Sequence, residues 1–224
     1  VVARFDPETY SDAVAFARIG EGSLGGKARG LAFMNSMILK HRLYDKHANV
    51  RIMIPRSVVI ATDYFDDFIR LNGLKYIISQ EFSDEEILSE FVSSTVPARL
   101  QQELKAYIQT VRTPLAVRSS SKLEDSHYQS FAGIYSTYMI PYVDNGDQML
   151  RLLLKAVKSV YASVYFATSR AYLSSSQNLI SEEKMAVIIQ EVCGTEQDGL
   201  FFPTFSGVAR SINYYPIGDE APAD

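Results

Sequence analysis

A glycine-rich segment that leads into a helical pattern places the strongest constraint on this chain. Residues 20–30, GEGSLGGKARG, hold five of the 12 glycines in the sequence. In the LAFMNSMILKHRL that follows, Leu31, Met34 and Ile38 repeat at spacings of three and four, which is typical of an amphipathic helix. A glycine turn at a helix N-terminus lets backbone N–H groups approach an anion, and Lys27 adds a cation. The segment therefore predicts a phosphate site.

Two known glycine-rich motifs can be compared with this segment, the P-loop and the dinucleotide-binding pattern. A P-loop requires Gly at position 21 and Ser or Thr at position 28, but the chain has Glu21 and Ala28, so it is not a P-loop. Residues 20–25 match the dinucleotide pattern G-x-G-x-x-G, with Asp45 about 20 residues on, but Asp45 does not end a hydrophobic strand. A plain helix-capping turn without a ligand stays an alternative.

The rest of the first half predicts one extended segment followed by helices. Residues 51–62, RIMIPRSVVIAT, form the extended segment, in which Pro55 favours an edge position or a strand start. Helix signals then follow: an N-cap at Thr62, a stop at Asn72-Gly73, a capping box at Ser83 and Glu86, and a first-turn proline at Pro97. Residues 62–111 are therefore expected to be mostly helical.

The second half changes character. Residues 114–120 (PLAVRSS) and 131–141 (FAGIYSTYMIP) predict strands, residues 147–172 predict a long helical region, and residues 185–192 (MAVIIQEV) predict an apolar strand. The helical region has an apolar stripe at core spacing, formed by Leu150, Leu153, Leu154, Val157, Val160 and Tyr161. The stretch after residue 199 predicts short strands and turns. We expect a helix-rich front lobe over residues 1–112 and a mixed α/β back lobe over residues 113–224.

The strand at 114–120 brings a second candidate for phosphate binding. It ends on Arg118, which is followed by Ser119 and Ser120. A permanently charged guanidinium beside hydroxyls and exposed amides suits a phosphate group. The alternative is a surface ion pair with Glu124 or Asp125.

Composition excludes several classes of protein. The formal net charge of −4 gives no overall attraction to nucleic acid or to anionic lipid. The sequence has no run of about 18 apolar residues and no signal peptide, so no membrane partner is expected. The single cysteine, Cys193, is expected to be a buried thiol in a reducing cytoplasm. The missing initial Met and the polar ending GDEAPAD suggest a segment excised from a longer chain.

Five segments together resemble a known family. They are LGGKARGLAFM, IPRSVVIATDYFDDFI, LAVRSSSKLEDSHYQSFAGIYSTYMI, VYASVYFATSRAYL and MAVIIQEVCGTEQDGLFFP. In this order and at these gaps they resemble the ATP-binding domain of phosphoenolpyruvate synthases and pyruvate phosphate dikinases, which rifampicin phosphotransferases and glucan water dikinases share. The combination of GGK with AVRSS-x-x-x-ED-x-x-x-x-SFAG is the most specific part, and the resemblance covers nearly the whole chain.

The resemblance implies an α+β, ATP-grasp-like domain that holds nucleotide between two lobes and is truncated at its C-terminus. It implies that the lysine and the arginine contact the ATP phosphates, that the SFAG turn and the next strand lie over them, and that the strand ending in IQ faces the adenine. By position the implied nucleotide residues are Gly25, Gly26, Lys27, Arg118, Ser119, Gly133, Thr137, Gln190, Glu191 and Val192.

For the complete enzyme, the resemblance implies that Mg²⁺-bound ATP donates a phosphoryl or pyrophosphoryl group to a histidine on a swivelling domain, on the way to pyruvate. The partners would be that phosphohistidine domain and a pyruvate-binding barrel, and a homodimer stays open. The Mg²⁺ ligands would lie beyond Asp224, and the segment alone is expected to be inactive. None of the histidines present, His41, His47 and His127, has the sequence context of the acceptor.

Three positions depart from the family pattern. Ile134 replaces a usual Gln, Phe202-Pro203 replaces a usual Phe-Thr, and Tyr161 stands where a Trp is usual. These departures keep two alternatives open: a nucleotide-binding regulatory module without catalysis, and a dikinase-like enzyme that acts on another small-molecule acceptor. A Rossmann dehydrogenase is a remote further option.

Overall fold

The computed structural model describes residues 2–10, 15–78, 80–121, 134–175 and 183–208. The chain divides into two compact units, residues 1–192 and residues 193–224. The first unit contains the sheet, the helices and every predicted site residue that the structure describes, up to Val192.

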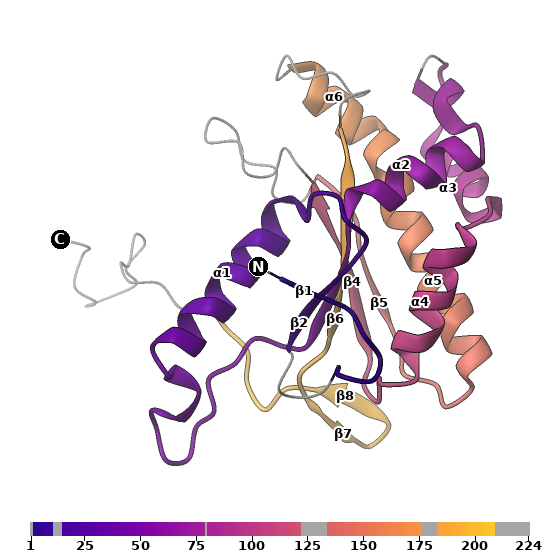
Figure 1. Cartoon of the computed structure of the whole chain (residues 1–224). Helices are drawn as coiled ribbons and strands as arrows, with labels where there is room; N and C mark the ends of the chain where they lie inside the picture. Colours follow the sequence, from indigo (N-terminus) through magenta and orange to yellow (C-terminus); the bar gives the residue numbers. More distant parts are fainter. Residues whose placement is uncertain (1, 11–14, 79, 122–133, 176–182, 209–224) are drawn as a thin grey trace, which may run out of the picture. The chain divides into compact units, whose positions relative to one another are not determined.

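The first unit is built on a six-stranded mixed sheet (Figure 1). Its strands stand in the order β1-β2-β3-β6-β4-β5. The first three are parallel to one another, while β6 is antiparallel to both β3 and β4, and β5 is antiparallel to β4. The strands are β1 (Ala3–Arg4), β2 (Phe16–Ile19), β3 (Ser57–Ile60), β4 (Leu115–Ser121), β5 (Thr137–Ile140) and β6 (Met185–Glu191).

The two strands at the centre are the most apolar ones. All four residues of β3 are buried, as are the first six residues of β6, because both strands have neighbours on each side and side chains packed on each face. Pro55 lies just before β3, outside the hydrogen-bonded ladder. Of the two expected places for this proline, the strand start is the one found.

Helices cover both faces of the sheet (Figure 1). One face carries α1, which packs against β4 and β6, and the other carries α2 and α5, with α3 and α4 packed on α5. The helices are α1 (Gly25–Lys40), α2 (Thr62–Leu71), α3 (Asp84–Ser93), α4 (Ala98–Ile108), α5 (Gly146–Ala162) and α6 (Ala167–Ser175), with 3-10 turns η1 (Leu43–Asp45), η2 (Leu74–Ile78) and η4 (Ser163–Tyr165).

Most of the predicted helix signals act as expected. The capping box is confirmed, because Ser83 Oγ accepts from the Glu86 N–H while the Glu86 carboxylate accepts from the Ser83 N–H. The helix stop at Asn72-Gly73 is also confirmed, since Gly73 has a φ of +66°. The N-cap prediction for Thr62 is wrong: Ala61 is the N-cap and Thr62 is already helical.

The long helical region at 147–172 is broken into two helices. Between α5 and α6 the chain forms η4 and then Phe166, whose φ of −64° and ψ of 155° are extended. The predicted apolar stripe of α5 holds, because Leu150, Leu153, Val157, Val160 and Tyr161 are buried and Leu154 is partly buried.

The two faces of the sheet have separate cores. The larger core joins the sheet to α2, α3, α4 and α5 and includes Phe68, Phe91 and Leu104, each with no exposed surface. The smaller core lies under α1 and consists of Phe16, Ala28, Ile54, Val59, Ala186 and Ile188. The stripe predicted for α1 is buried only in part, since Met34 is 49% exposed and Leu31 and Ile38 are half-buried.

The sheet is continuous across the expected lobe boundary at residues 112 and 113. Strands β1, β2 and β3 come from the first segment, and β4, β5 and β6 come from the second. In the second compact unit, β7 (Thr195–Gln197) and β8 (Leu200–Phe202) form a hairpin. Strand β8 lies in the stretch predicted to form short strands, and β7 lies before it. Cys193 is exposed, so the prediction of a buried thiol is wrong. Among the described helices, none has the length and apolar character needed to cross a bilayer.

Candidate functional site

The glycine segment lies directly against the C-terminal end of β4, which carries the serines. Helix α1 begins at Gly25, inside the glycine segment and earlier than the hydrophobic pattern indicates. Gly25 has a φ of +70°, and a Cβ atom there would lie 1.9 Å from the carbonyl oxygen of Ser120. Both the backbone conformation and the close approach of two backbones therefore require glycine at this position.

Ser120 fastens the start of α1 to β4. Its Oγ accepts from the Ala28 N–H at 3.0 Å and donates to the Leu24 carbonyl at 2.8 Å. Between these two attachment points lies Lys27, whose Nζ donates to Ser119 Oγ at 3.1 Å. The predicted lysine and the predicted serine strand, 92 positions apart, are thus brought together.

Arg118 lies on the same strand, one residue before Ser119. Its Nη1 donates to Gln190 Oε1 at 3.1 Å. This contact follows from the register, because Gln190 pairs with Ala116, which puts Arg118 diagonally across from it on the same face. Two more of the predicted nucleotide residues, from β4 and β6, are therefore in direct contact.

The orientation of the Gln190 amide is fixed by its neighbours. A guanidinium can only donate, so the amide oxygen must face Arg118. The amide nitrogen then donates to Ser57 Oγ at 3.2 Å, and Ser57 donates to the Pro55 carbonyl at 2.9 Å. Gln190 is buried, and this chain of hydrogen bonds ties Arg118 to the start of β3.

Beyond Arg118 the same face of the sheet is open. Thr137 of β5 pairs with Arg118, and Met139 pairs with Ala116. Thr137 is exposed and Met139 is 61% exposed. A half-buried cation flanked by an exposed hydroxyl and an exposed thioether forms a polar surface with an apolar margin, which can contact both a charged and an aromatic part of a ligand.

Glu191 and Val192 lie at the end of β6 in a different setting. The Glu191 carboxylate forms an ion pair with Arg56 at 2.6 Å, and the two side chains are only 12% and 17% exposed. Thr113 Oγ1 donates to the same carboxylate at 3.3 Å. The Val192 N–H donates to the Pro114 carbonyl at 2.9 Å. The side chain of Glu191 therefore serves a buried ion pair.

Of the remaining predicted residues, the structure describes some and not others. Gly133 lies outside the described residues, as do His127, Glu124 and Asp125. Gly26 is buried in the first turn of α1, next to Lys27. Of the three departures from the family pattern, Tyr161 is buried with its ring 5.1 Å from that of Phe65, Ile134 packs against the larger core, and Phe202 lies in the β7-β8 hairpin.

Two residues of α2 that the sequence did not single out for the site also hold the glycine segment. The Asp63 carboxylate accepts from the Glu21 N–H at 2.9 Å and from the Gly22 N–H at 3.1 Å. Thr62 Oγ1 accepts from the Ser23 N–H at 3.0 Å. No local signal could have revealed these contacts, because the partners are about 40 positions apart.

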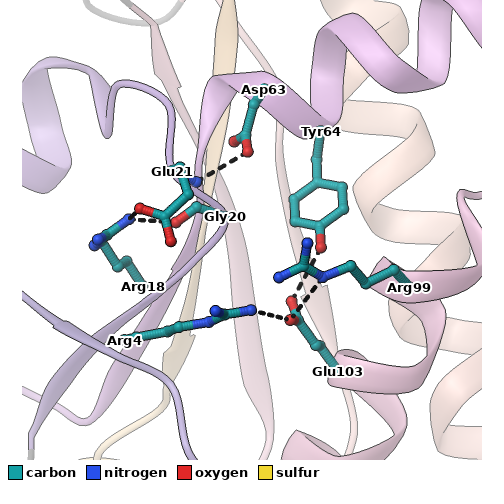
Figure 2. A network of polar contacts seen from close by, with 8 residues as sticks. All are labelled: Arg4, Arg18, Gly20, Glu21, Asp63, Tyr64, Arg99 and Glu103. Carbon is teal, nitrogen blue, oxygen red and sulfur yellow. Dashed lines mark hydrogen bonds and ion pairs between the residues drawn. The ribbon is translucent and has the colours of Figure 1, made fainter.

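Figure 2 shows a second polar cluster, in which Tyr64 of α2 meets Arg4 of β1 and two charged residues of α4, Arg99 and Glu103. Glu103 accepts from Arg4 at 3.2 Å and from the Tyr64 hydroxyl at 3.2 Å, and it lies 3.5 Å from Arg99. Burial, together with the negative charge of Glu103, raises the pKa of Tyr64 to about 12. These contacts attach α2, and with it Asp63, to α4 and β1.

Metal ligands are scarce in the part of the chain that the structure describes. No group of three or more His, Cys, Asp or Glu side chains is arranged there to hold an ion.

Lys27, which donates to Ser119, and Arg118, which donates to Gln190, thus place two cations at adjoining residues of β4, close to the N-terminus of α1. Cations of this kind can bind an anion. The model of the pyruvate phosphate dikinase AMP/ATP-binding domain matches residues 21–222 of the chain. The chain belongs to this family, and the resemblance found in the sequence is confirmed.

Curated relatives agree with this membership. The chain is 28% identical over 192 residues to the uncharacterized phosphotransferase YvkC of Bacillus subtilis (strain 168), a match that covers 84% of this chain and 20% of the relative. It is 25% identical to the phosphoenolpyruvate synthase of Aeropyrum pernix, covering 80% of this chain and 22% of that enzyme. It is 26% identical to the prodigiosin synthesizing transferase PigC of Serratia marcescens, covering 80% and 18%. The chain thus spans about a fifth of the length of these relatives.

Proposed function

We propose that this chain binds ATP and serves as the phosphotransferase domain of a phosphoenolpyruvate synthase-like enzyme. ATP would donate a phosphoryl or pyrophosphoryl group to a histidine on another domain, on the way to pyruvate. The observation that carries the proposal is the contact of Lys27 with Ser119, the residue after Arg118 on β4, in a domain of the AMP/ATP-binding family.

The two cations would act by charge. Phosphoryl transfer leaves the protein little covalent work, so its contribution is to position the phosphates and to stabilise the charge that develops on them. Ser119 of β4 holds Lys27, and Gln190 of β6 holds Arg118, the residue just before Ser119. Cations fixed in place before ATP arrives need little reorganisation during the reaction.

The other predicted residues would surround the nucleotide. Gly25, Gly26 and Ser119 would line the phosphates together with the cations, and Gly133 and Thr137 would lie over them. Gln190 and Val192 would face the adenine. Because the Glu191 side chain pairs with Arg56, we expect Glu191 to contribute through its backbone. Mg²⁺ would accompany the ATP, and we assign it no ligand among the described residues.

The small molecule that finally receives the phosphoryl group is less well defined than the nucleotide. The relatives include a phosphoenolpyruvate synthase and a prodigiosin synthesizing transferase, so similar domains are found in proteins named for different products. A dikinase-like enzyme with another small-molecule acceptor is therefore the second candidate. Pyruvate-dependent formation of AMP and phosphoenolpyruvate by a longer protein that includes this chain would favour the first candidate over the second.

Calorimetric titration of the chain with Mg-ATP tests the nucleotide site. We expect binding by the unsubstituted chain and a loss of about 10-fold to 100-fold in affinity in Lys27→Ala and in Arg118→Ala, since a hydrogen bond to a charged group contributes about 1.5–3 kcal/mol. Lys40→Ala, at the other end of α1, and Arg112→Ala, just before β4, are matched controls that should bind normally. Absence of binding, or equal affinity in all four variants, contradicts the proposal.

A further inference from the structure

In the first half of the glycine segment, the backbone N–H groups already donate hydrogen bonds to side chains of this chain. Three successive backbone amides, those of Glu21, Gly22 and Ser23, donate to side chains of α2. The acceptors are both carboxylate oxygens of Asp63 and the hydroxyl of Thr62. In addition, the Thr62 N–H donates to the Ser23 carbonyl at 3.0 Å. Figure 2 shows Asp63 reaching from the start of α2 to this segment.

The glycines at positions 20 and 22 are explained by these contacts without any ligand. A Cβ atom on Gly20, whose φ is +93°, would lie 2.5 Å from an oxygen of the Asp63 carboxylate. A Cβ atom on Gly22 would lie 2.6 Å from the Asp63 nitrogen and 2.7 Å from Thr62 Oγ1. Two of the glycines that predicted a phosphate site therefore serve the approach of α2 instead.

The carboxylate is well placed to hold these amides. Asp63 lies in the first turn of α2, where the positive end of the helix dipole favours a negative charge. Hydrogen bonds from amides to a carboxylate are stronger than those to a neutral acceptor. An amide that donates to Asp63 does not donate to a phosphate, so the phosphate contacts of this segment fall to the first turn of α1 and to Lys27.

The segment is thus fastened at both ends. Asp63 and Thr62 hold residues 21–23, and Ser120 holds Leu24 and Ala28. Lys27 lies within the second attachment, in the first turn that the held segment leads into. The direction of that turn, and so the place of the Lys27 amine, depends on the conformation of residues 20–24.

We propose that Asp63, assisted by Thr62, is a positioning residue for the nucleotide site. It fixes the glycine segment in the conformation that brings Lys27 to Ser119, and it does not contact the nucleotide itself. This inference rests on the proposed function, since it assigns Asp63 an effect on ATP binding that acts through Lys27.

The test compares Asp63→Asn with Asp67→Asn in the whole chain. The side-chain amide introduced by the first substitution has the shape of the carboxylate, but an NH₂ group replaces one of the two oxygens and cannot accept from the backbone amide that this oxygen held. Asp67 lies on the same helix and forms an exposed ion pair with Arg70 at 2.6 Å, so the second variant removes an equal charge away from the segment. For both, amide hydrogen exchange, the thermal midpoint and Mg-ATP affinity are measured.

In Asp63→Asn, we expect the amide hydrogens of residues 21–23 to exchange about tenfold faster and the affinity for Mg-ATP to fall about tenfold. In Asp67→Asn, the exchange rates and the affinity should be unchanged. In a Lys27→Met background, Asp63→Asn should cause no further loss of affinity. Should Asp63→Asn fail to fold, Thr62→Val, which removes an acceptor without changing size, should show the same pattern at the Ser23 amide, and Thr62→Ser should behave normally.

The outcomes separate this inference from the proposed function. If the unsubstituted chain does not bind Mg-ATP, the proposed function fails, and this inference fails with it. If the chain binds but Asp63→Asn binds equally well, or if the loss persists undiminished in the Lys27→Met background, only the positioning role of Asp63 is overturned. Unchanged exchange at residues 21–23 would overturn it as well.

Discussion

The two faces of the six-stranded sheet differ in how they are covered. The face under α2 and α5 continues into α3 and α4, and its core contains large side chains with no exposed surface, such as Phe68, Phe91 and Leu100. Among the residues that the structure describes, the core of the face under α1 has only six buried members. On that face the sheet also carries Arg118, with the exposed Thr137 and Met139 beside it.

The same strands supply both faces. Along β6, Val187 and Ile189 belong to the larger core, while Ala186 and Ile188 belong to the smaller one, since successive side chains point to opposite faces. The last two residues of the strand are Gln190 and Glu191. The Gln190 side chain accepts a hydrogen bond from Arg118. The comparison indicates that burial on one face stabilises the strands, which leaves the other face free to present charged groups.

The largest expected effect tests where stability resides. Phe91→Ala should lower the free energy of unfolding by about 3–5 kcal/mol, because the ring is fully buried between those of Phe68 and Tyr165. Phe33→Ala, on the 66% exposed ring of α1, should change it by no more than about 0.5 kcal/mol. Urea unfolding measures both. Similar losses in the two variants would contradict the difference between the faces.

A smaller effect tests how α1 is fastened to the open face. Gly25→Ala should cost about 1–3 kcal/mol of stability and weaken Mg-ATP binding, because it strains a positive φ and drives a methyl group into the Ser120 carbonyl. Gly30→Ala is the control on the same helix. A Cβ atom there meets nothing within 4 Å, so the substitution should stabilise the chain by up to about 1 kcal/mol.

Thermal unfolding measures the stability of Gly25→Ala and Gly30→Ala, and calorimetric titration measures their affinity for Mg-ATP. A Gly25→Ala chain that binds Mg-ATP as tightly as the unsubstituted chain would show that the close approach of α1 to β4 has no part in the nucleotide site.

The smallest effect concerns pH on the well-packed face. Because the pKa of Tyr64 is raised to about 12 in the folded chain, against about 10 in an unfolded one, folding favours the protonated phenol. Its contribution to stability is fully present below pH 10 and is lost as the pH rises from 10 to 12. Unfolding free energies of the unsubstituted chain and of Tyr64→Phe, measured from pH 8 upward, should converge or cross above pH 10. A difference that does not vary with pH would contradict the stated role of burial and Glu103.

Much of the local structure was predictable from the sequence. The capping box at Ser83 and Glu86, the stop at Asn72-Gly73 and the apolar stripe of α5 all depend on residues within about four positions of one another. Such signals act within one element and need no knowledge of the fold. Family membership was likewise predictable, because it depends on the order and spacing of motifs.

Other expectations failed where tertiary contacts compete with local ones. Thr62 was predicted to cap α2, but its hydroxyl accepts from the Ser23 amide 39 positions away. The helical region predicted at 147–172 is interrupted by η4 and by the extended Phe166, which its hydrophobic pattern does not indicate. Cys193 follows an apolar strand and was predicted to be buried, but the strand ends at Glu191 and the thiol is exposed.

By itself the sequence determined most of the helices and strands, the apolar face of α5 and the family, because these follow from near neighbours and from the order of motifs. The tertiary structure decided which elements meet. The Lys27–Ser119 and Arg118–Gln190 contacts, and the capture of the glycine segment by Asp63, join residues 92, 72 and 41 or 42 positions apart. They arise only once β3, β6 and β4 lie side by side, since strand order and register, and no local propensity, set these distances.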